Sequence, residues 1–209
     1  MSRCIIVSAG SFAPQMKQAL LPGDTIIACD AGYRHCQAMG VQPHIVLGDF
    51  DSAPPPPRDD LVVLPHVKDD TDTHYAARLA VQQGFTEVLL LGALGGRRIE
   101  HTLANLATAL WLTKQGVQVT LQDENSRISY VCPGSPRQYK KERYLYLSVF
   151  PAEGLATGVC IQGAYYPLQN AKLSGEYPLG VSNEFAPGCD AVTISTESGI
   201  LQVIETIAD

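Results

Sequence analysis

The fold is decided by one stretch, residues 25–52, which reads TIIACDAGYRHCQAMGVQPHIVLGDFDS. Its apolar runs at residues 25–29 and 45–47 have the length of strands, and they lack the polar alternation of a half-exposed sheet. Residues 32–39 between them have helical composition, and Gly40 follows where a glycine cap is expected. The stretch therefore predicts a strand, a helix and a second strand that is parallel to the first.

The same alternation extends over the first two thirds of the chain. Further apolar runs of strand length occupy residues 4–7, 61–64, 88–91 and 117–121, and helical stretches occupy residues 14–20, 73–83 and 102–115. Repeated strand–helix–strand units predict an α/β fold with a parallel sheet and right-handed crossovers. We assign this α/β domain to residues 1–131.

The pattern changes after residue 121. A cluster of breaking residues, Cys132-Pro133-Gly134-Ser135-Pro136, precedes β-rich runs at residues 144–150, 158–162, 191–195 and 201–204 with no convincing helix. Glu197-Ser198-Gly199 is typical of a hairpin turn between the last two runs. The sequence therefore predicts a second, small all-β domain over residues 143–209.

Composition restricts the classes of function. Hydrophobic residues make up 45% and charged residues 17% of the 209, which is typical of a globular protein and not of a disordered one. Fifteen Lys and Arg against 21 Asp and Glu give a net charge of −6, and no basic run is present. This balance argues against a nucleic-acid partner or an anionic membrane surface.

The compartment is expected to be the cytoplasm. The first residues lack the features of a signal peptide, and no stretch approaches 18 consecutive apolar residues. The six cysteines are widely spaced without a C-x-x-C pair, so reduced thiols are favoured over disulfides or a zinc site.

Acidic residues follow three of the predicted strands. These residues are Asp30 after the second strand, Asp49 and Asp51 after the third, and Asp69, Asp70 and Asp72 after the fourth. The carboxyl ends of parallel strands meet at one edge of a sheet, where α/β proteins bind their ligands. The segment Gly95-Gly96-Arg97-Arg98 follows the next strand, so this edge is expected to carry acids, glycines and cations together.

Asp49 and Asp51 are candidate magnesium ligands. Residues two apart in an extended segment project to the same side, and Mg²⁺ is usually held by one or two carboxylates together with substrate phosphates. A turn in which the side chains bond to their own backbone is the alternative. Asp69 and Asp72 are similar candidates at the start of a helix, where capping the helix is the alternative role.

Arg97, Arg98 and the neighbouring glycines are candidates for holding phosphate oxygens, with Asn105 one turn after His101 on the same helix face. A glycine turn with solvated arginines is the alternative interpretation. Neither a G-x-G-x-x-G fingerprint nor a P-loop is present.

Several motifs together resemble the thiamine pyrophosphokinase family, and the resemblance covers nearly the whole chain. They are Asp30-Ala31-Gly32, Gly48-Asp49-Phe50-Asp51-Ser52, Lys68-Asp69-Asp70-Thr71-Asp72, Gly95-Gly96-Arg97, His101-Thr102-Leu103-Ala104-Asn105 and Val181-Ser182-Asn183-Glu184. The resemblance implies a Rossmann-like ATP-binding domain followed by a C-terminal β-sandwich. It also implies a homodimer, in which thiamine binds between the α/β domain of one subunit and the β domain of the other.

The implied reaction is a Mg²⁺-dependent transfer of the diphosphoryl group of ATP to the hydroxyl of thiamine, giving thiamine diphosphate and AMP. On this interpretation the catalytic carboxylates are Asp49, Asp51, Asp69 and Asp72, and the metal ligands are Asp49, Asp51, Asp72 and Glu100. The residues implied for ATP and phosphate binding are Asp30, Gly32, Ser52, Lys68, Arg97, His101 and Asn105. Ser182 and Asn183 are implied for thiamine.

The chain departs from the family pattern at two places. Glu100 stands where the family usually has an aspartate, and the preceding glycine loop is one residue longer. The family can place a tryptophan near thiamine, whereas Trp111 lies in a predicted helix of the first domain, so Phe185 or Tyr177 is expected to serve instead. Diphosphoryl transfer to another hydroxymethyl heterocycle, such as a pterin, is the alternative activity, and a sensor without turnover is the alternative class of protein.

Overall fold

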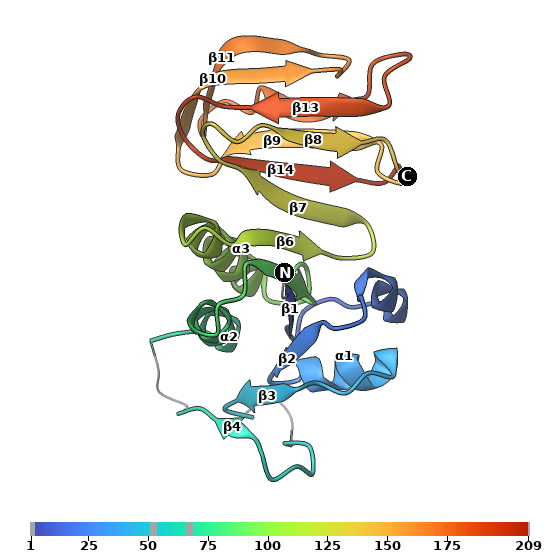
Figure 1. Cartoon of the computed structure of the whole chain (residues 1–209), viewed down its shortest axis with the longest axis vertical. Coiled ribbons are helices and arrows are strands. Elements are labelled where there is room, and N and C mark those ends of the chain that lie inside the picture. Colours follow the sequence, from blue (N-terminus) through green and yellow to red (C-terminus); the bar gives the residue numbers. More distant parts are fainter. Residues whose placement is uncertain (1–2, 51–53, 66–68, 209) are drawn as a thin grey trace. The chain divides into compact units, whose positions relative to one another are not determined.

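The structure is a computed structural model that describes residues 3–50, 54–65 and 69–208 (Figure 1). The chain divides into two compact units, residues 1–124 and 125–209. The expected first domain extended to residue 131, so the two boundaries differ by strand β7 (Ser126–Val131), which pairs with the last strand of the chain in the second unit.

The first unit contains the predicted parallel sheet. Its strands are β1 (Arg3–Val7), β2 (Thr25–Cys29), β3 (Ile45–Gly48), β4 (Val62–Val63), β5 (Glu87–Leu91) and β6 (Gln118–Gln122). Every pairing between them is parallel, in the spatial order β4-β3-β2-β1-β5-β6. The chain therefore builds outward from β1 to β4 and then returns to the other side of β1, so the order reverses between β1 and β5.

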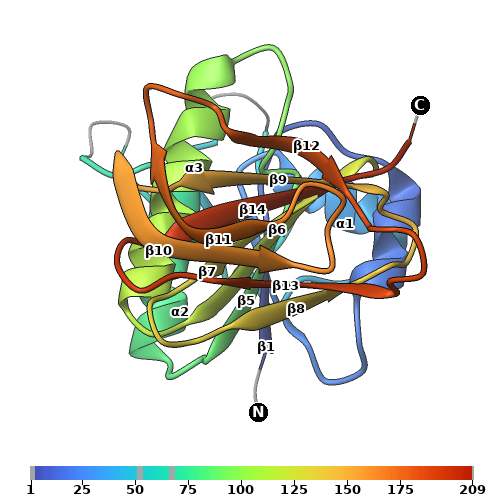
Figure 2. The same cartoon turned by 90° about the horizontal axis from the view of Figure 1, so that it is seen from above.

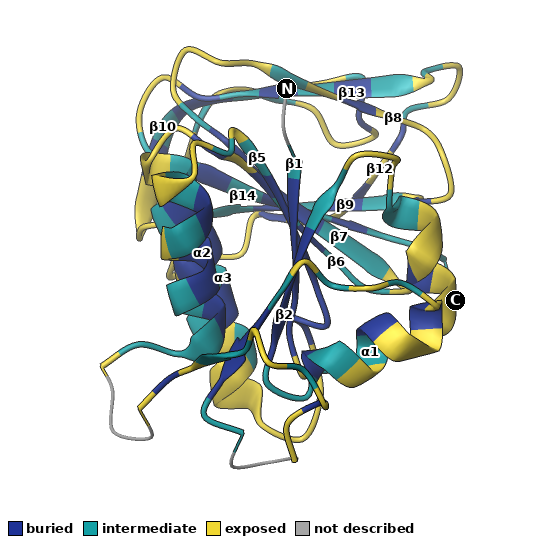
Figure 3. Cartoon of the chain, turned by 60° about the horizontal axis from the view of Figure 1, so that its bottom comes forward, coloured by how far each residue is buried: buried dark blue, intermediate teal, exposed yellow. Residues whose placement is uncertain are grey.

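Helices cover both faces of this sheet (Figure 3). Helices α2 (Asp72–Gln82) and α3 (Ile99–Lys114) lie on one face, and α1 (Gly32–Met39) lies on the other. The 3₁₀ helix η1 (Pro14–Ala19) packs beside α1, since its Met16 belongs to the same core as Cys36 and Met39. Ile5 and Val7 pack against Cys36 and Met39 of α1 in one fully buried core. Because side chains alternate across a strand, Cys4 and Ile6 point to the opposite face, where they are also fully buried.

Two predicted helices differ in detail from the observed ones. Residues 14–19 form a 3₁₀ helix. It ends before the expected residue 20 because Leu20 is already extended and Leu21 precedes Pro22, a position that disfavours helical backbone. Helix α3 begins at Ile99, three residues before the expected start.

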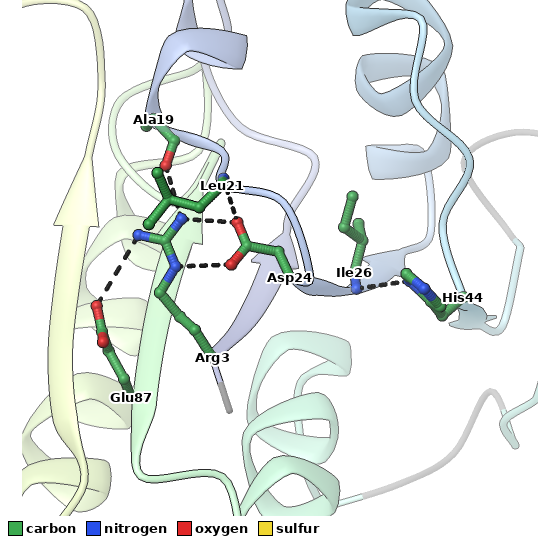
Figure 4. A network of polar contacts seen from close by, with 7 residues as sticks. All are labelled: Arg3, Ala19, Leu21, Asp24, Ile26, His44 and Glu87. Carbon is green, nitrogen blue, oxygen red and sulfur yellow. Dashed lines mark hydrogen bonds and ion pairs between the residues drawn. The ribbon is translucent and has the colours of Figure 1, made fainter. Parts of the chain in front are cut away.

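An ion pair ties together the amino ends of the strands (Figure 4). The Arg3 guanidinium donates to both carboxylate oxygens of Asp24, at 2.9 and 2.6 Å, and to the carbonyl of Ala19 at 2.8 Å. Burial alone raises the pKa of Asp24, but hydrogen bonds from Arg3 and from the Leu21 N–H outweigh it and lower that pKa. This network fastens η1 and the start of β2 to the start of β1, far from the carboxyl ends.

The second unit contains two antiparallel sheets (Figure 2). Their remaining strands are β8 (Arg137–Lys140), β9 (Tyr146–Pro151), β10 (Leu155–Gln162), β11 (Leu168–Ser174), β12 (Gly180–Glu184), β13 (Ala191–Ser195) and β14 (Leu201–Thr206). One sheet has the order β12-β9-β14-β7 and the other β11-β10-β13-β8. Buried side chains from both sheets form a single core.

The predicted hairpin at residues 197–199 is wrong. Strand β13 pairs with β10 and β8, whereas β14 pairs with β7 and β9, so the connection passes from one sheet to the other. Local turn chemistry cannot distinguish a hairpin from a connection between two sheets, because the same Gly-containing turn occurs in both.

All six cysteines are free thiols. Within residues 3–50, 54–65 and 69–208, no helix is long and apolar enough to cross a membrane.

Candidate active site

A cavity of about 310 Å³ lies at the carboxyl ends of the parallel strands of the first unit. Its walls come from the segments that follow β1, β2, β3 and β5 and from the first turns of α2 and α3. The lining residues are Ser8, Ala9, Gly10, Cys29, Asp30, Asp49, Thr71, Asp72, Thr73, Ala93, Gly95, Gly96, Arg97, Arg98, His101 and Asn105. The cavity thus lies where the strand order reverses, which is the usual ligand position in such sheets.

Three carboxylates form the acidic part of the cavity. Asp30 directly follows β2 with a left-handed backbone (φ 45°), and Asp49 directly follows β3. Asp72 is the first residue of α2, behind Thr71, whose hydroxyl caps the helix by accepting the His74 N–H at 3.1 Å. One carboxylate oxygen of Asp30 and one of Asp72 are buried.

The charge of Asp72 acts on a thiol in the same wall. Burial raises the pKa of the Cys29 thiol well above its usual value, and the nearby Asp72 carboxylate raises it further. The Cys29 thiol donates to the Asp72 carbonyl with Sγ 3.6 Å from the oxygen. Cys29 is therefore a protonated wall residue and not a nucleophile.

Arg97, Arg98 and His101 form the basic part. The two arginines are exposed and follow the glycine loop after β5, and His101 lies in the first turn of α3. Basic residues and three carboxylates in one cavity suit a ligand that carries both negative charge and bound metal, such as a metal-bound polyphosphate.

The loops after β1 and β5 form one hydrogen-bonded unit, residues 8–11 with residues 91–96, which we call the double loop. Backbone N–H groups of Ser8, Gly10 and Ser11 donate to carbonyls of Leu91, Gly92 and Leu94 at 2.8, 2.7 and 3.2 Å. A Cβ atom on Gly10 would lie 2.5 Å from the Gly92 carbonyl oxygen, and one on Gly92 would lie 2.3 Å from that of Ser8. Only glycine allows these backbones to approach so closely.

Buried polar contacts fix the segments that carry Ala93, Ser8 and Thr73, which all line the cavity. The Asn105 amide is 6% exposed and donates to the Ala93 carbonyl at 2.8 Å. The hydroxyls of Ser8 and Thr73 are 2.7 Å apart, which joins the double loop to the first turn of α2. Asn105 therefore orients the loop after β5 as well as lining the cavity.

Of the first-unit site residues that the family resemblance implies, the structure brings six into this cavity and leaves others out. The six are Asp30, Asp49, Asp72, Arg97, His101 and Asn105. Gly32, Asp69 and Glu100 are not among the lining residues. Asp51, Ser52 and Lys68 lie outside the described residues.

Gly32 has a packing role in the structure. A Cβ atom at this position would lie 2.1 Å from the Val7 carbonyl oxygen, because the start of α1 passes directly over the end of β1. Asp69 is exposed, and its neighbour Asp70 forms an ion pair with Arg78.

The predicted metal ligand Glu100 is not among the residues that line the cavity. Its side chain is 61% exposed and accepts a hydrogen bond from Arg98 Nε at 2.7 Å, which lowers the pKa of its carboxyl. It sits in the first turn of α3, where an acid is favoured by the helix dipole whether or not a metal is near. The structure therefore places Glu100 on the helix surface outside the cavity.

Asn183, predicted for thiamine, is 4% exposed in the second unit. Its Oδ1 accepts N–H groups of Tyr166 and Glu184 at 3.0 and 2.9 Å, and its Nδ2 donates to the Tyr166 carbonyl at 2.8 Å. Its amide thus anchors the turn that carries Tyr165 and Tyr166. Ser182 beside it is exposed with a left-handed backbone (φ 55°).

The aromatic residues expected near thiamine separate in the structure. Phe185 belongs to the core of the second unit, whereas Tyr177 is 67% exposed. Trp111 lies in α3 and its ring is 5.0 Å from that of His74, which agrees with a packing role.

Sequence reasoning missed the wall formed by Ser8, Ala9 and Gly10. These residues are small and uncharged, so they carried no chemical signal. Their position after the first strand was the available signal, because the strand at which the order reverses borders the ligand crevice.

The donor set suits a hard cation. Asp49 and Asp72 supply oxygen ligands in one cavity, and Mg²⁺ needs only one or two carboxylates when phosphates and water complete its shell. Among the described residues, no three His, Cys, Asp or Glu side chains are grouped to hold a metal by themselves. The residues therefore fit a metal that arrives with a phosphate ligand.

Comparison with known proteins identifies the family. Residues 16–121 match the family described as "Thiamin pyrophosphokinase, catalytic domain", and residues 137–201 match "Thiamin pyrophosphokinase, vitamin B1 binding domain". The chain is 28% identical over 187 residues to the thiamine pyrophosphokinase of Bacillus subtilis, and the match covers 86% of each protein.

Solved structures agree with this match. A crystal structure of thiamine pyrophosphokinase from Bacillus subtilis has a TM-score of 0.89 and 25% identity, with all of both chains covered. That from Geobacillus thermodenitrificans has a TM-score of 0.85 and 27% identity, with 100% of this chain and 98% of the other covered. This chain belongs to the thiamin pyrophosphokinase family, with the catalytic and vitamin B1 binding domains in succession along its sequence.

Proposed function

We propose that this chain transfers the diphosphoryl group of ATP to the hydroxyl of thiamine, giving thiamine diphosphate and AMP, and that the transfer requires Mg²⁺. The observation that carries the proposal is the cavity of the first unit, which Asp30, Asp49 and Asp72 line together with Arg97 and His101. A triphosphate needs carboxylates that hold a charge-neutralising metal, and it needs basic groups that hold its oxygens in place.

Asp49 and Asp72 are the residues we assign to the metal, together with Asp51, which lies outside the described residues. Bound there, Mg²⁺ supplies neutralisation of the charge on the triphosphate. Arg97 and His101 donate to phosphate oxygens, and the first turn of α2 presents the positive end of a helix to them. Lys68 and Ser52 are assigned to the phosphates from the family resemblance.

In the reaction the thiamine hydroxyl oxygen forms a bond to the β-phosphorus, and the bond between that phosphorus and the oxygen bridging to the α-phosphorus breaks. AMP leaves with the bridging oxygen. The attacking hydroxyl loses a proton, for which a cavity carboxylate is the acceptor. The protein contributes mainly by holding the two substrates in line, as is usual for phosphoryl transfer.

We assign the two substrates to different units of the chain. We describe the first unit as a Rossmann-like domain that binds ATP, and the second as a β-sandwich that binds thiamine through the exposed Ser182 region. The active enzyme is a homodimer in which each site draws on both subunits. The reaction is assigned to the cytoplasm, where the six free thiols are stable.

The decisive experiment measures AMP release from ATP by the purified chain with and without thiamine and Mg²⁺. We expect AMP and thiamine diphosphate in equal amounts, and neither product when chelator removes Mg²⁺. A hydroxymethyl pterin offered in competition tests the alternative acceptor. Binding of ATP or thiamine without AMP release would identify a sensor and overturn the proposal.

A further inference from the structure

His35 contacts the double loop from outside the cavity. It lies on α1, half-buried, and is not among the residues that line the cavity. Its Nε2 is 3.2 Å from the Gly10 carbonyl oxygen. A carbonyl oxygen can only accept, so His35 donates an N–H from Nε2.

A second contact fixes the imidazole ring. It stacks on the ring of Phe12 with centroids 4.3 Å apart and an interplanar angle of 13°. Burial also lowers the pKa of His35 below its usual value, so the ring is neutral at physiological pH. Gly10 and Phe12 both belong to the segment that follows β1, so His35 of α1 contacts this segment at two residues that are two positions apart.

His35 also contacts the loop that follows β5. A Cβ atom on Gly92 would lie 3.4 Å from Cδ2 of His35, so the ring also lies against the second half of the double loop. That half contains Gly95 and Gly96 and continues into Arg97, and all three residues line the cavity. Because the two halves are hydrogen-bonded with almost no free space between their backbones, a shift of Gly10 moves both walls.

We propose that His35 is a positioning residue for the nucleotide, which sets the place of the double loop through the Gly10 carbonyl and so the spacing between Arg97 and the cavity carboxylates. It touches neither substrate nor metal. The inference rests on the proposed function, because it assumes that the double loop borders the ATP site. Loss of the His35 hydrogen bond should weaken ATP binding while leaving the thiamine side unaffected.

The test compares three variants with the wild-type chain. His35→Leu removes the donor at similar size, and His35→Gln retains an N–H near the position of Nε2. His44→Leu is the matched control, because His44 also bonds the backbone, accepting the Ile26 N–H at Nδ1 at 3.0 Å, but at the amino ends of the strands (Figure 4). Each variant is measured by steady-state kinetics, thermal melting and calorimetric binding of α,β-methylene-ATP.

We expect His35→Leu to raise the KM for ATP and the Kd for the analogue about tenfold, the size of one lost hydrogen bond, with the KM for thiamine unchanged. His35→Gln should restore most of the affinity. His44→Leu should lower the melting temperature and leave both KM values unchanged. If His35→Leu does not fold, the contrast between His35→Gln and Phe12→Leu carries the test, since only the second should weaken analogue binding.

Three results would overturn the inference: an ATP affinity within twofold of wild type in His35→Leu, an equal loss for thiamine, or an equal loss in His44→Leu. Failure of the proposed function is separate, because it would show as no analogue binding or no AMP release by the wild-type chain.

Discussion

Substitutions of single carboxylates should affect kcat according to whether the side chain lines the cavity. Asp49 and Asp72 line the cavity, so Asp49→Asn or Asp72→Asn removes negative charge needed by the metal without removing packing volume. We expect each to reduce kcat at least about 100-fold, the loss typical of one electrostatic group at a reacting centre. Kinetics at several Mg²⁺ concentrations measure this.

The exposed Asp59 supplies the control. Asp59→Asn makes the same chemical change outside the cavity and should leave kcat and the Mg²⁺ requirement unchanged. Near-normal turnover with a wild-type Mg²⁺ requirement in both cavity variants would remove Asp49 and Asp72 from the metal site.

Glu100 should behave differently from the cavity acids. The family resemblance suggested a metal ligand, but the carboxylate is exposed and hydrogen-bonded to Arg98. Glu100→Gln is therefore expected to change kcat less than about twofold and to lower the melting temperature only slightly, because the interaction of an exposed acid with the first helical turn is weak. A large fall in kcat with an unchanged melting temperature would restore Glu100 to the active site.

At the residue scale, the sequence predicted charged site residues better than uncharged ones. Asp30, Asp49 and Asp72 were found because each follows a recognisable buried strand or begins a helix. The Ser8–Gly10 wall was not found, since its role comes from the reversal of strand order, which is a property of the whole sheet. Asn183 was found as a motif residue, but only the structure shows that its amide is occupied by Tyr166.

At the element scale, a bidentate ion pair joins two strands of the second unit. Arg127 of β7 and Glu205 of β14 are direct partners in the strand register, with two hydrogen bonds of 2.7 Å, and Glu205 is 1% exposed. Arg127→Ala leaves a buried carboxylate uncompensated, so we expect it to lower the free energy of unfolding by about 3 kcal/mol. Chemical denaturation with fluorescence detection measures the loss.

Two further variants sharpen this prediction. Arg127→Lys should recover only part of the stability, because an ammonium cannot form the paired hydrogen bonds of a guanidinium. Lys140→Ala, an exposed change in β8, should alter stability by less than about 0.5 kcal/mol. A loss in Arg127→Ala no larger than that in Lys140→Ala would show that the ion pair adds no net stability.

The helices and strands of the first unit were predictable because local sequence patterns determine them. Strands buried on both faces have continuous apolar sequences, and helices α1 and α2 were expected within one residue of their observed limits. Strands β7, β8, β11 and β12 were missed. Strands β8, β11 and β12 are short or largely exposed, so their sequences lack apolar alternation, and β7 mixes polar with apolar residues although it is largely buried. Their pairing depends on partner strands elsewhere in the chain, which local sequence patterns do not reveal.

At the scale of the whole molecule, the proposed homodimer with shared sites makes a quantitative prediction. Asp72→Asn damages the ATP side of a site, and Ser182→Arg places a cation where the cationic thiamine is proposed to bind. Each variant alone should be inactive. Mixed in equal amounts and allowed to exchange subunits, they should recover about a quarter of wild-type activity, because half of the dimers are mixed and one site in each is intact.

The alternative arrangement gives a different result from the same mixture. If each site were built within one subunit, every site in a mixed dimer would carry one of the two changes, and no activity would return. Size-exclusion chromatography with light scattering confirms that both variants remain dimers, and melting curves confirm that both remain folded. Recovery near a quarter therefore requires that two subunits contribute to one site, whereas no recovery by folded, exchanging dimers places the whole site in a single chain.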